Sequence, residues 1–174
     1  MPRFDEKSAT CEIFTFREGV LSAIGHDLKL RATRFAIEVE PQSVRALVDL
    51  SSIRVMAALR GGKEDPDALS PRDRRDIEQA CANEVLEVHR FPEATFVSTD
   101  VRTTDEGWIV QGTLSLHGRT LEGSFDVRRE GDRAVASVDL DVRRFGIKPY
   151  SAMLGALRVQ PRVRAVVSTP AVGV

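Results

Sequence analysis

Three histidines, His26, His89 and His117, are the residues of this chain best suited to acid–base or metal chemistry. They stand on separate predicted elements and lack the short spacings that zinc ligands usually show, so the sequence predicts no metal site. His26 is followed by Asp27, and the pair could form a general base with an orienting carboxylate. Neighbouring side chains of a strand point to opposite faces, however, which argues against a direct contact between them.

Nucleophile motifs are absent from the chain. It contains no G-x-S-x-G, the strand-to-helix turn that exposes a catalytic serine. Its two cysteines, Cys11 and Cys81, are far apart in sequence, and without an export signal we expect free thiols rather than a disulfide. The sequence therefore favours a non-catalytic protein without a cofactor. If the protein is an enzyme after all, His26 or His117 is the candidate general base.

A basic cluster near the C-terminal third could hold an anionic group. Its members are Arg143, Arg144, Lys148 and Arg158. Guanidinium and ammonium groups bind carboxylates and phosphates through charge-assisted hydrogen bonds. The other interpretation is a solvated rim, in which these cations pair with Asp139 and Asp141.

An irregular segment over 145–157 carries a few apolar side chains: Tyr150, Met153 and Leu154. They could form a flexible apolar lip beside a cavity, because methionine adapts to varied shapes. Equally, they could anchor a loop to the core.

Composition limits the classes of protein that remain. The 174 residues fit one domain, 1–174, and 42% of them are hydrophobic, which is enough for a core. The net charge of -1 is spread along the chain, with no basic stripe for nucleic acid. No apolar stretch approaches the roughly 20 residues of a membrane span. The N-terminal residues lack the apolar region of a signal peptide, so we expect a cytoplasmic protein.

Period-two alternation is the main structural signal. Apolar or small residues occupy the even positions from Trp108 to Leu116 and the odd positions from Leu121 to Val127. Such alternation predicts two strands with one dry face each, joined through His117-Gly118-Arg119 as a hairpin. Similar patterns predict strands over 11–18, 20–24, 26–39, 44–50, 94–101, 137–143 and 159–167. The phase slips near Thr33-Arg34, which indicates a bulge or sharp bend.

One helix is predicted after the polar loop 61–69. Ser70 can cap it, Pro71 suits its first turn, and Asp73 has the right charge for its positive end. A narrow apolar stripe of Ile77, Cys81 and Val85 predicts a surface helix of about four turns. The fold class is therefore all-β with one surface α-helix. About eight antiparallel strands favour closure into a barrel, which removes exposed edges and can hold one small ligand.

Several segments resemble the YceI family, the lipocalin-like polyisoprenoid-binding proteins of bacteria. They are F-P-E-A-T-F-V-S-T at 91–99, G-T-L-S-L-H-G-R-T at 112–120, V-R-R-F-G-I at 142–147 and, more loosely, G-H-D-L at 25–28. The resemblance implies an extended, lipocalin-like antiparallel barrel with an apolar interior that binds long amphiphiles such as isoprenoids or fatty-acid derivatives. Many members are exported to the periplasm, and this sequence departs from them in showing no signal peptide.

The predicted ligand-binding residues are the inward-facing set of the strands, together with the basic and irregular segments. They are Trp108, Val110, Leu114, Leu116, Phe125, Val127, Val138, Leu140, Val142, Arg143, Arg144, Tyr150, Met153 and Leu154. The apolar members could line a cavity, or they could fill the barrel. Gly112 and Gly123 remove volume from the inward face, or they mark bends of the sheet.

Our leading hypothesis is a non-catalytic carrier, with a long-chain amphiphile inside the barrel and its polar head near residues 144–158. The alternative is a packed, ligand-free β-module that acts through protein contacts, for example as a homodimer. A third hypothesis is an enzyme that acts on an amphiphilic lipid.

Overall fold

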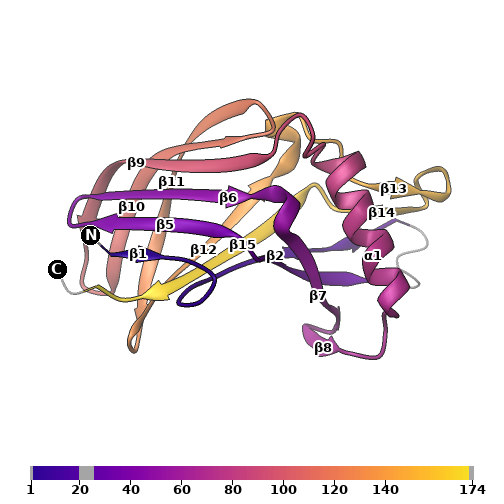
Figure 1. Ribbon diagram of the computed structural model, residues 1–174, viewed down its shortest axis with the longest axis horizontal. Helices are drawn as coiled ribbons and strands as arrows, with labels where there is room; N and C mark the ends of the chain where they lie inside the picture. Colours follow the sequence, from indigo (N-terminus) through magenta and orange to yellow (C-terminus); the bar gives the residue numbers. More distant parts are fainter. Residues whose placement is uncertain (1, 20–25, 173–174) are drawn as a thin grey trace.

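Alternating apolar and polar residues build most of this chain into antiparallel strands (Figure 1). The computed structural model describes residues 2–19 and 26–172; the strand predicted over 20–24 lies outside them. The main sheet has 12 strands in the spatial order β1 (Arg3–Phe4), β5 (Phe35–Glu40), β6 (Ser43–Asp49), β9 (Glu93–Thr103), β10 (Gly107–Leu116), β11 (Arg119–Glu130), β12 (Arg133–Asp141), β15 (Arg162–Pro170), β2 (Thr10–Thr15), β4 (Asp27–Ala32), β7 (Ile53–Arg60) and β8 (Lys63–Asp65). A small second sheet contains β13 (Ser151–Ala152), β14 (Leu157–Val159) and β3 (Arg17–Glu18).

A sharp corner joins the two ends of the main sheet. At Thr33-Arg34 the chain bends from β4 into β5, and at the short 3₁₀ turn η2 (Leu50–Ser52) it bends from β6 into β7. The β5–β6 half of this ribbon pairs with β9, whereas its β4–β7 half pairs with β2. The sheet therefore curls into a barrel-like shape. Because β4–β5 and β6–β7 are bent strands and β1 and β8 are very short, about eight long strands remain, as predicted.

Ser52 fixes this corner. Its side chain is 1% exposed. Its hydroxyl accepts hydrogen bonds from the backbone N–H groups of Thr33 (3.2 Å) and Arg34 (2.9 Å) and donates to the carbonyl of Asp49 (2.7 Å). The predicted phase slip at 33–34 is therefore confirmed as a bend, and its cause is a corner shared by two neighbouring strands.

Two clusters of buried residues pack the corner side of the sheet. One contains Phe4, Cys11, Ala32, Phe35 and Ile37 with Ala9. The other contains Leu30, Val55, Ala58 and Leu69. By contrast, among the described residues of β9 to β12 the only buried hydrophobic side chains are those of Val110 and Ala136. The well-packed core thus lies to one side, and the long hairpin strands are less completely covered.

Helix α1 (Pro71–Ala80) continues into a π-helical turn, η3 (Cys81–Val85), and together they give the predicted four turns. The capping box is present: the Ser70 hydroxyl accepts from the N–H of Asp73 (3.1 Å), and the Asp73 carboxylate accepts from the N–H of Ser70 (2.8 Å). The helix lies near the end of the sheet opposite the chain termini (Figure 1), with Ile77 against the second buried cluster. In the described part of the chain no helix is long and apolar enough to span a bilayer.

Candidate functional site

The inward face of the curled sheet is the first candidate site. Directly opposed residues of β9, β10 and β11 form rows across it, for example Phe96–Leu114–Leu121 and Val101–Val110–Phe125. The rows continue through Val127 and Ala136 to Val167 on β15 and Cys11 on β2. Since Cys11 and Val167 belong to the packed cluster around Phe35, this apolar face is the concave one.

Most of this concave face is only half-buried. Val110 is buried, but the other predicted inward residues keep part of their surface exposed: Trp108, Leu114, Leu116, Phe125, Val127, Val138, Leu140 and Val142. Side chains that filled the interior completely would show the burial seen around Phe35. The structure thus brings the predicted apolar set together without burying it.

Gly112 serves packing. It lies where the register of β9 and β10 shifts by one residue. A Cβ atom added to it would lie 2.5 Å from the Phe96 ring and would also overlap the carbonyl oxygen of Val97. The Phe96 ring lies over this glycine and reaches the Phe125 ring of β11, with ring centroids 5.1 Å apart. Gly112 therefore makes room for an aromatic contact across the intervening strand.

Gly123 has a different environment. It lies directly opposite Gly112, on the same inward face of β11 as Leu121 and Phe125. A Cβ atom added to Gly123 would meet no atom within 4 Å, and the residue is exposed. Here the inward face borders open space.

Trp108 marks the other end of β10. Its ring contacts the guanidinium of Arg129, whose carbon lies 4.9 Å from the ring centroid. This cation–π contact places a positive charge near the end of the concave face where β10 begins.

The basic cluster is partly neutralised by carboxylates. Arg143 donates from its guanidinium to both oxygens of Asp141, the shortest bond being 2.7 Å, and this ion pair holds the pKa of Asp141 below its usual range. Arg158 pairs with Glu18 at 2.9 Å. Arg144 and Lys148 are exposed. The rim interpretation is thus confirmed for Arg143, although Asp139 pairs with Arg164 (2.9 Å) and Arg162 (3.7 Å) instead.

The irregular segment forms a projecting hairpin, β13–β14, at the helix end (Figure 1). Leu154 is fully exposed, with φ = +56°, and Tyr150 is also exposed. Neither side chain anchors the loop in the core. The side chain of Met153 lies outside what the structure describes.

The position of His117 could not be predicted from the sequence. It follows the odd-numbered, polar positions of its strand, so the alternation by itself predicts a solvent-facing side chain. The structure leaves its side chain only 10% exposed. Its Nε2 lies 2.8 Å from Glu87 Oε2 and its Nδ1 lies 3.3 Å from the carbonyl oxygen of Phe145. The two-residue turn explains the difference, because His117 (φ = +53°) and Gly118 (φ = +75°) both have positive φ, which redirects the imidazole.

The other two histidines lie on other parts of the chain. His89 is exposed, and His26 precedes β4, where the Asp27 carboxylate accepts a hydrogen bond from the backbone N–H of Arg17 at 2.8 Å. Within residues 2–19 and 26–172, no group of three His, Cys, Asp or Glu side chains could hold a metal ion.

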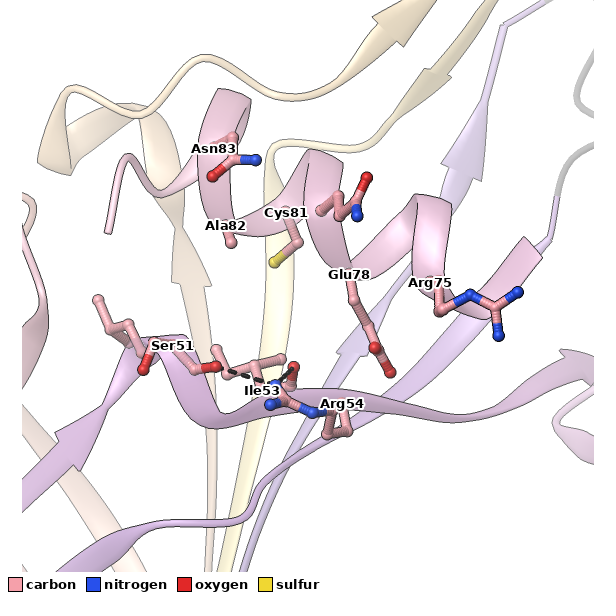
Figure 2. Close-up of a pocket in the computed structure, with 10 residues that line it drawn as sticks. Ser51, Ile53, Arg54, Arg75, Glu78, Cys81, Ala82 and Asn83 are labelled. Atoms are coloured by element: carbon pink, nitrogen blue, oxygen red, sulfur yellow. Dashed lines mark hydrogen bonds between the residues drawn. The ribbon is translucent and has the colours of Figure 1, made fainter. Parts of the chain in front are cut away.

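A second candidate is the cleft between α1–η3 and the start of β7 (Figure 2). Apolar groups of Leu50, Ile53, Cys81 and Ala82 line it together with polar ones, and its volume is about 280 Å³. In Figure 2, Cys81 and Glu78 point from the helix toward the strand.

The charged side chains Glu78 and Arg54 of this cleft already form hydrogen bonds with the backbone. Glu78 accepts from the backbone N–H of Val55 at 2.9 Å, and Arg54 donates to the carbonyls of Ser51 and Ile53. Burial, with a smaller contribution from the charge of Glu78, raises the pKa of Cys81 to about 11, so its thiol stays protonated and unreactive near neutral pH. The cleft therefore offers little chemistry.

Comparisons with known proteins support both the family resemblance of the sequence and the fold of the curled sheet. A family model described as the YceI-like domain matches residues 5–169. The chain belongs to the YceI-like family. A UPF0312 protein of Yersinia enterocolitica is 40% identical over 50 residues, a match that spans 29% of this chain and only about a quarter (26%) of that protein.

Several solved structures share the fold at low sequence identity. BcnA of Burkholderia cenocepacia superposes with a TM-score of 0.60 at 14% identity, covering 94% of this chain and 96% of that one. A polyisoprenoid-binding domain from Saccharophagus degradans, implicated in plant cell wall breakdown, gives 0.56 at 10% identity, covering 94% of both chains. A YceI protein of Campylobacter jejuni gives 0.51 at 12% identity, covering 84% of this chain and 86% of that one. The predicted lipocalin-like YceI fold is thus confirmed.

Proposed function

We propose that this YceI-like protein binds a long-chain amphiphile, an isoprenoid or fatty-acid derivative, and carries it without chemical change. The apolar chain lies along the concave face of β9 to β12. The single observation that carries the proposal is the incomplete burial of this face, together with the open space at Gly123. The polyisoprenoid-binding domain that shares the fold supports an apolar chain as the ligand.

Burial of apolar surface supplies the binding energy. Each 100 Å² removed from water contributes about 2.5 kcal/mol before ordering costs are subtracted. A flexible chain needs few polar contacts under these conditions, so discrimination among tails is weak. For the head group, Arg144 and Lys148 are better candidates than Arg143, which would first have to leave Asp141.

Titration with a fluorescent long-chain fatty acid tests the proposal, with a polyprenyl phosphate as competitor. Gly123→Phe places a ring in the open space on the concave face, and we expect it to weaken binding by about tenfold or more. Ser124→Phe places the same ring on the outer face of the same strand and should leave the affinity unchanged. Absence of saturable binding by the unmodified protein would refute the proposal.

A further inference from the structure

The pairing of β11 with β12 stops halfway. The two strands form an antiparallel ladder only between Val127–Glu130 and Arg133–Ala136. Beyond that point β11 still pairs with β10 as far as Arg119, and β12 still pairs with β15 as far as Asp141. Residues 119–126 and 137–141 are therefore ordered strands whose facing edges share no ladder hydrogen bonds in the described structure. We call this unpaired stretch of the barrel wall the window.

Contacts between neighbouring segments fix both ends of the window. The ladder from Val127 onward closes one end. At the other end, the 3₁₀ turn η4 (Val142–Phe145) meets β11: Arg119 donates to the carbonyl of Arg144 at 3.4 Å, and His117 contacts the carbonyl of Phe145. A frayed edge would be free at one end. Because the unpaired stretch is fixed at both ends, its length is defined.

The inner rim of the window is apolar and incompletely filled. Leu121, Gly123 and Phe125 line it from β11, and Val138 and Leu140 line it from β12, all short of full burial. The Phe125 ring turns away from β12, toward Phe96. Gly123 lies midway along the unpaired stretch and faces open space.

The outer rim is charged. Glu122 and Asp126 are exposed on β11. On β12, Asp139 and Asp141 are bound to arginines. An apolar chain would therefore favour the inner rim over the outer one.

We propose that the window between residues 119–126 and 137–141 is a lateral entrance, through which the apolar chain of an amphiphile reaches the concave face sideways. This inference rests on the proposed function. An unpaired edge can also add an extended peptide strand, but the open space behind Gly123 and its continuity with the half-buried concave face favour an apolar chain.

A reversible cross-link across the window tests the entrance. If the ladder of Val127 with Ala136 continued, Ser124 would face Asp139 and lie diagonal to Ser137 across the window. Ser124 and Ser137 are both exposed. We would therefore join Ser124→Cys and Ser137→Cys, which lie on the outer face, with a short, thiol-cleavable bifunctional methanethiosulfonate reagent. The native Cys11 and Cys81 thiols, whose pKa burial raises to about 11, should remain unmodified at neutral pH. Stopped-flow fluorescence then measures uptake and release of a fluorescent long-chain fatty acid.

We expect the bridge to slow both uptake and release by about tenfold or more, with little change in Kd and full recovery after thiol cleavage. The matched control joins Arg128→Cys to Val135→Cys, two residues already opposed in the ladder, and should leave the rates unchanged. Unchanged rates in the bridged Ser124–Ser137 variant, with binding intact, would overturn the entrance, as would uptake of an extended peptide in place of the fatty acid. If the unbridged protein binds no fatty acid at all, the proposed function fails instead.

Discussion

At the scale of single residues, two glycines on one face of one hairpin have opposite roles. Sequence alternation places Gly112 and Gly123 on the same face, and in the structure they form a directly opposite cross-strand pair. The pattern alone could not distinguish a glycine that makes room for a ring from one that borders a cavity. That distinction depends on Phe96, which lies on another strand and reaches Gly112 only after folding.

Alanine substitutions should separate these roles. Gly112→Ala forces its methyl group against Phe96 and the Val97 carbonyl, so we expect a loss of about 1–3 kcal/mol in the free energy of unfolding. Gly123→Ala meets no neighbour and should be neutral or stabilise by about 0.5–1 kcal/mol, because glycine is costly in a strand. Urea denaturation of both variants measures the difference. Equal effects would show that the two environments are alike.

Glu12 gives a residue-scale prediction for pH. Burial alone raises the pKa of its carboxyl, but hydrogen bonds and charge from Arg31 (2.9 Å) and Lys29 (3.2 Å) outweigh burial and lower it from 4.5. A carboxylate with a lowered pKa in the folded state stabilises the protein above pH 4.5, and this contribution disappears as the pH falls through the folded-state pKa.

We therefore expect Glu12→Gln to cost about 1 kcal/mol at pH 7 and progressively less below pH 4.5. Urea midpoints measured from pH 3 to pH 7 should converge for the variant and the unmodified protein at the acid end. A constant difference across this range would contradict the assignment.

At the scale of elements, the corner of the ribbon connects local chemistry to barrel closure. The slip of phase at Thr33-Arg34 correctly predicted a bend, but the sequence did not reveal Ser52 as its centre. The sequence also did not predict β7, because this strand lacks a regular alternation of apolar and polar residues. Its buried residues include Val55, Ala57, Ala58 and Leu59, and a bulge opposite Lys29/Leu30 shifts the register. The strand β8 was also missed within the predicted polar loop, although the Gly61-Gly62 pair before it is typical of a hairpin turn.

Ser52→Ala should weaken this corner. It removes the hydroxyl that accepts from the backbone N–H of Arg34, whereas the N–H of Thr33 keeps the carbonyl of Ser52 at 3.1 Å. An unsatisfied buried donor costs about 1–3 kcal/mol. Chemical denaturation should show that loss, whereas Ser137→Ala on the exposed face of β12 should show almost none. A neutral Ser52→Ala would mean that water replaces the hydroxyl at no cost.

At the scale of the whole molecule, packing is uneven around the barrel. The corner side holds the buried clusters, while the long strands β9 to β12 present a half-buried concave face and an incomplete ladder. Period-two alternation could predict which residues share this face. It could not predict whether the face is filled, because filling depends on how far opposite walls stand apart. The predicted homodimer stays a prediction.

The chain has one tryptophan, Trp108, and it lies on the concave face, so its fluorescence reports directly on the interior. Titration with a fatty acid that carries a spin label along its chain is the most direct measurement of the central claim. We predict saturable quenching of Trp108 at one ligand per protein, which Gly123→Phe should reduce and Ser124→Phe should not. Unsaturable or absent quenching at ligand concentrations below the onset of micelles would show that no apolar chain occupies the concave face.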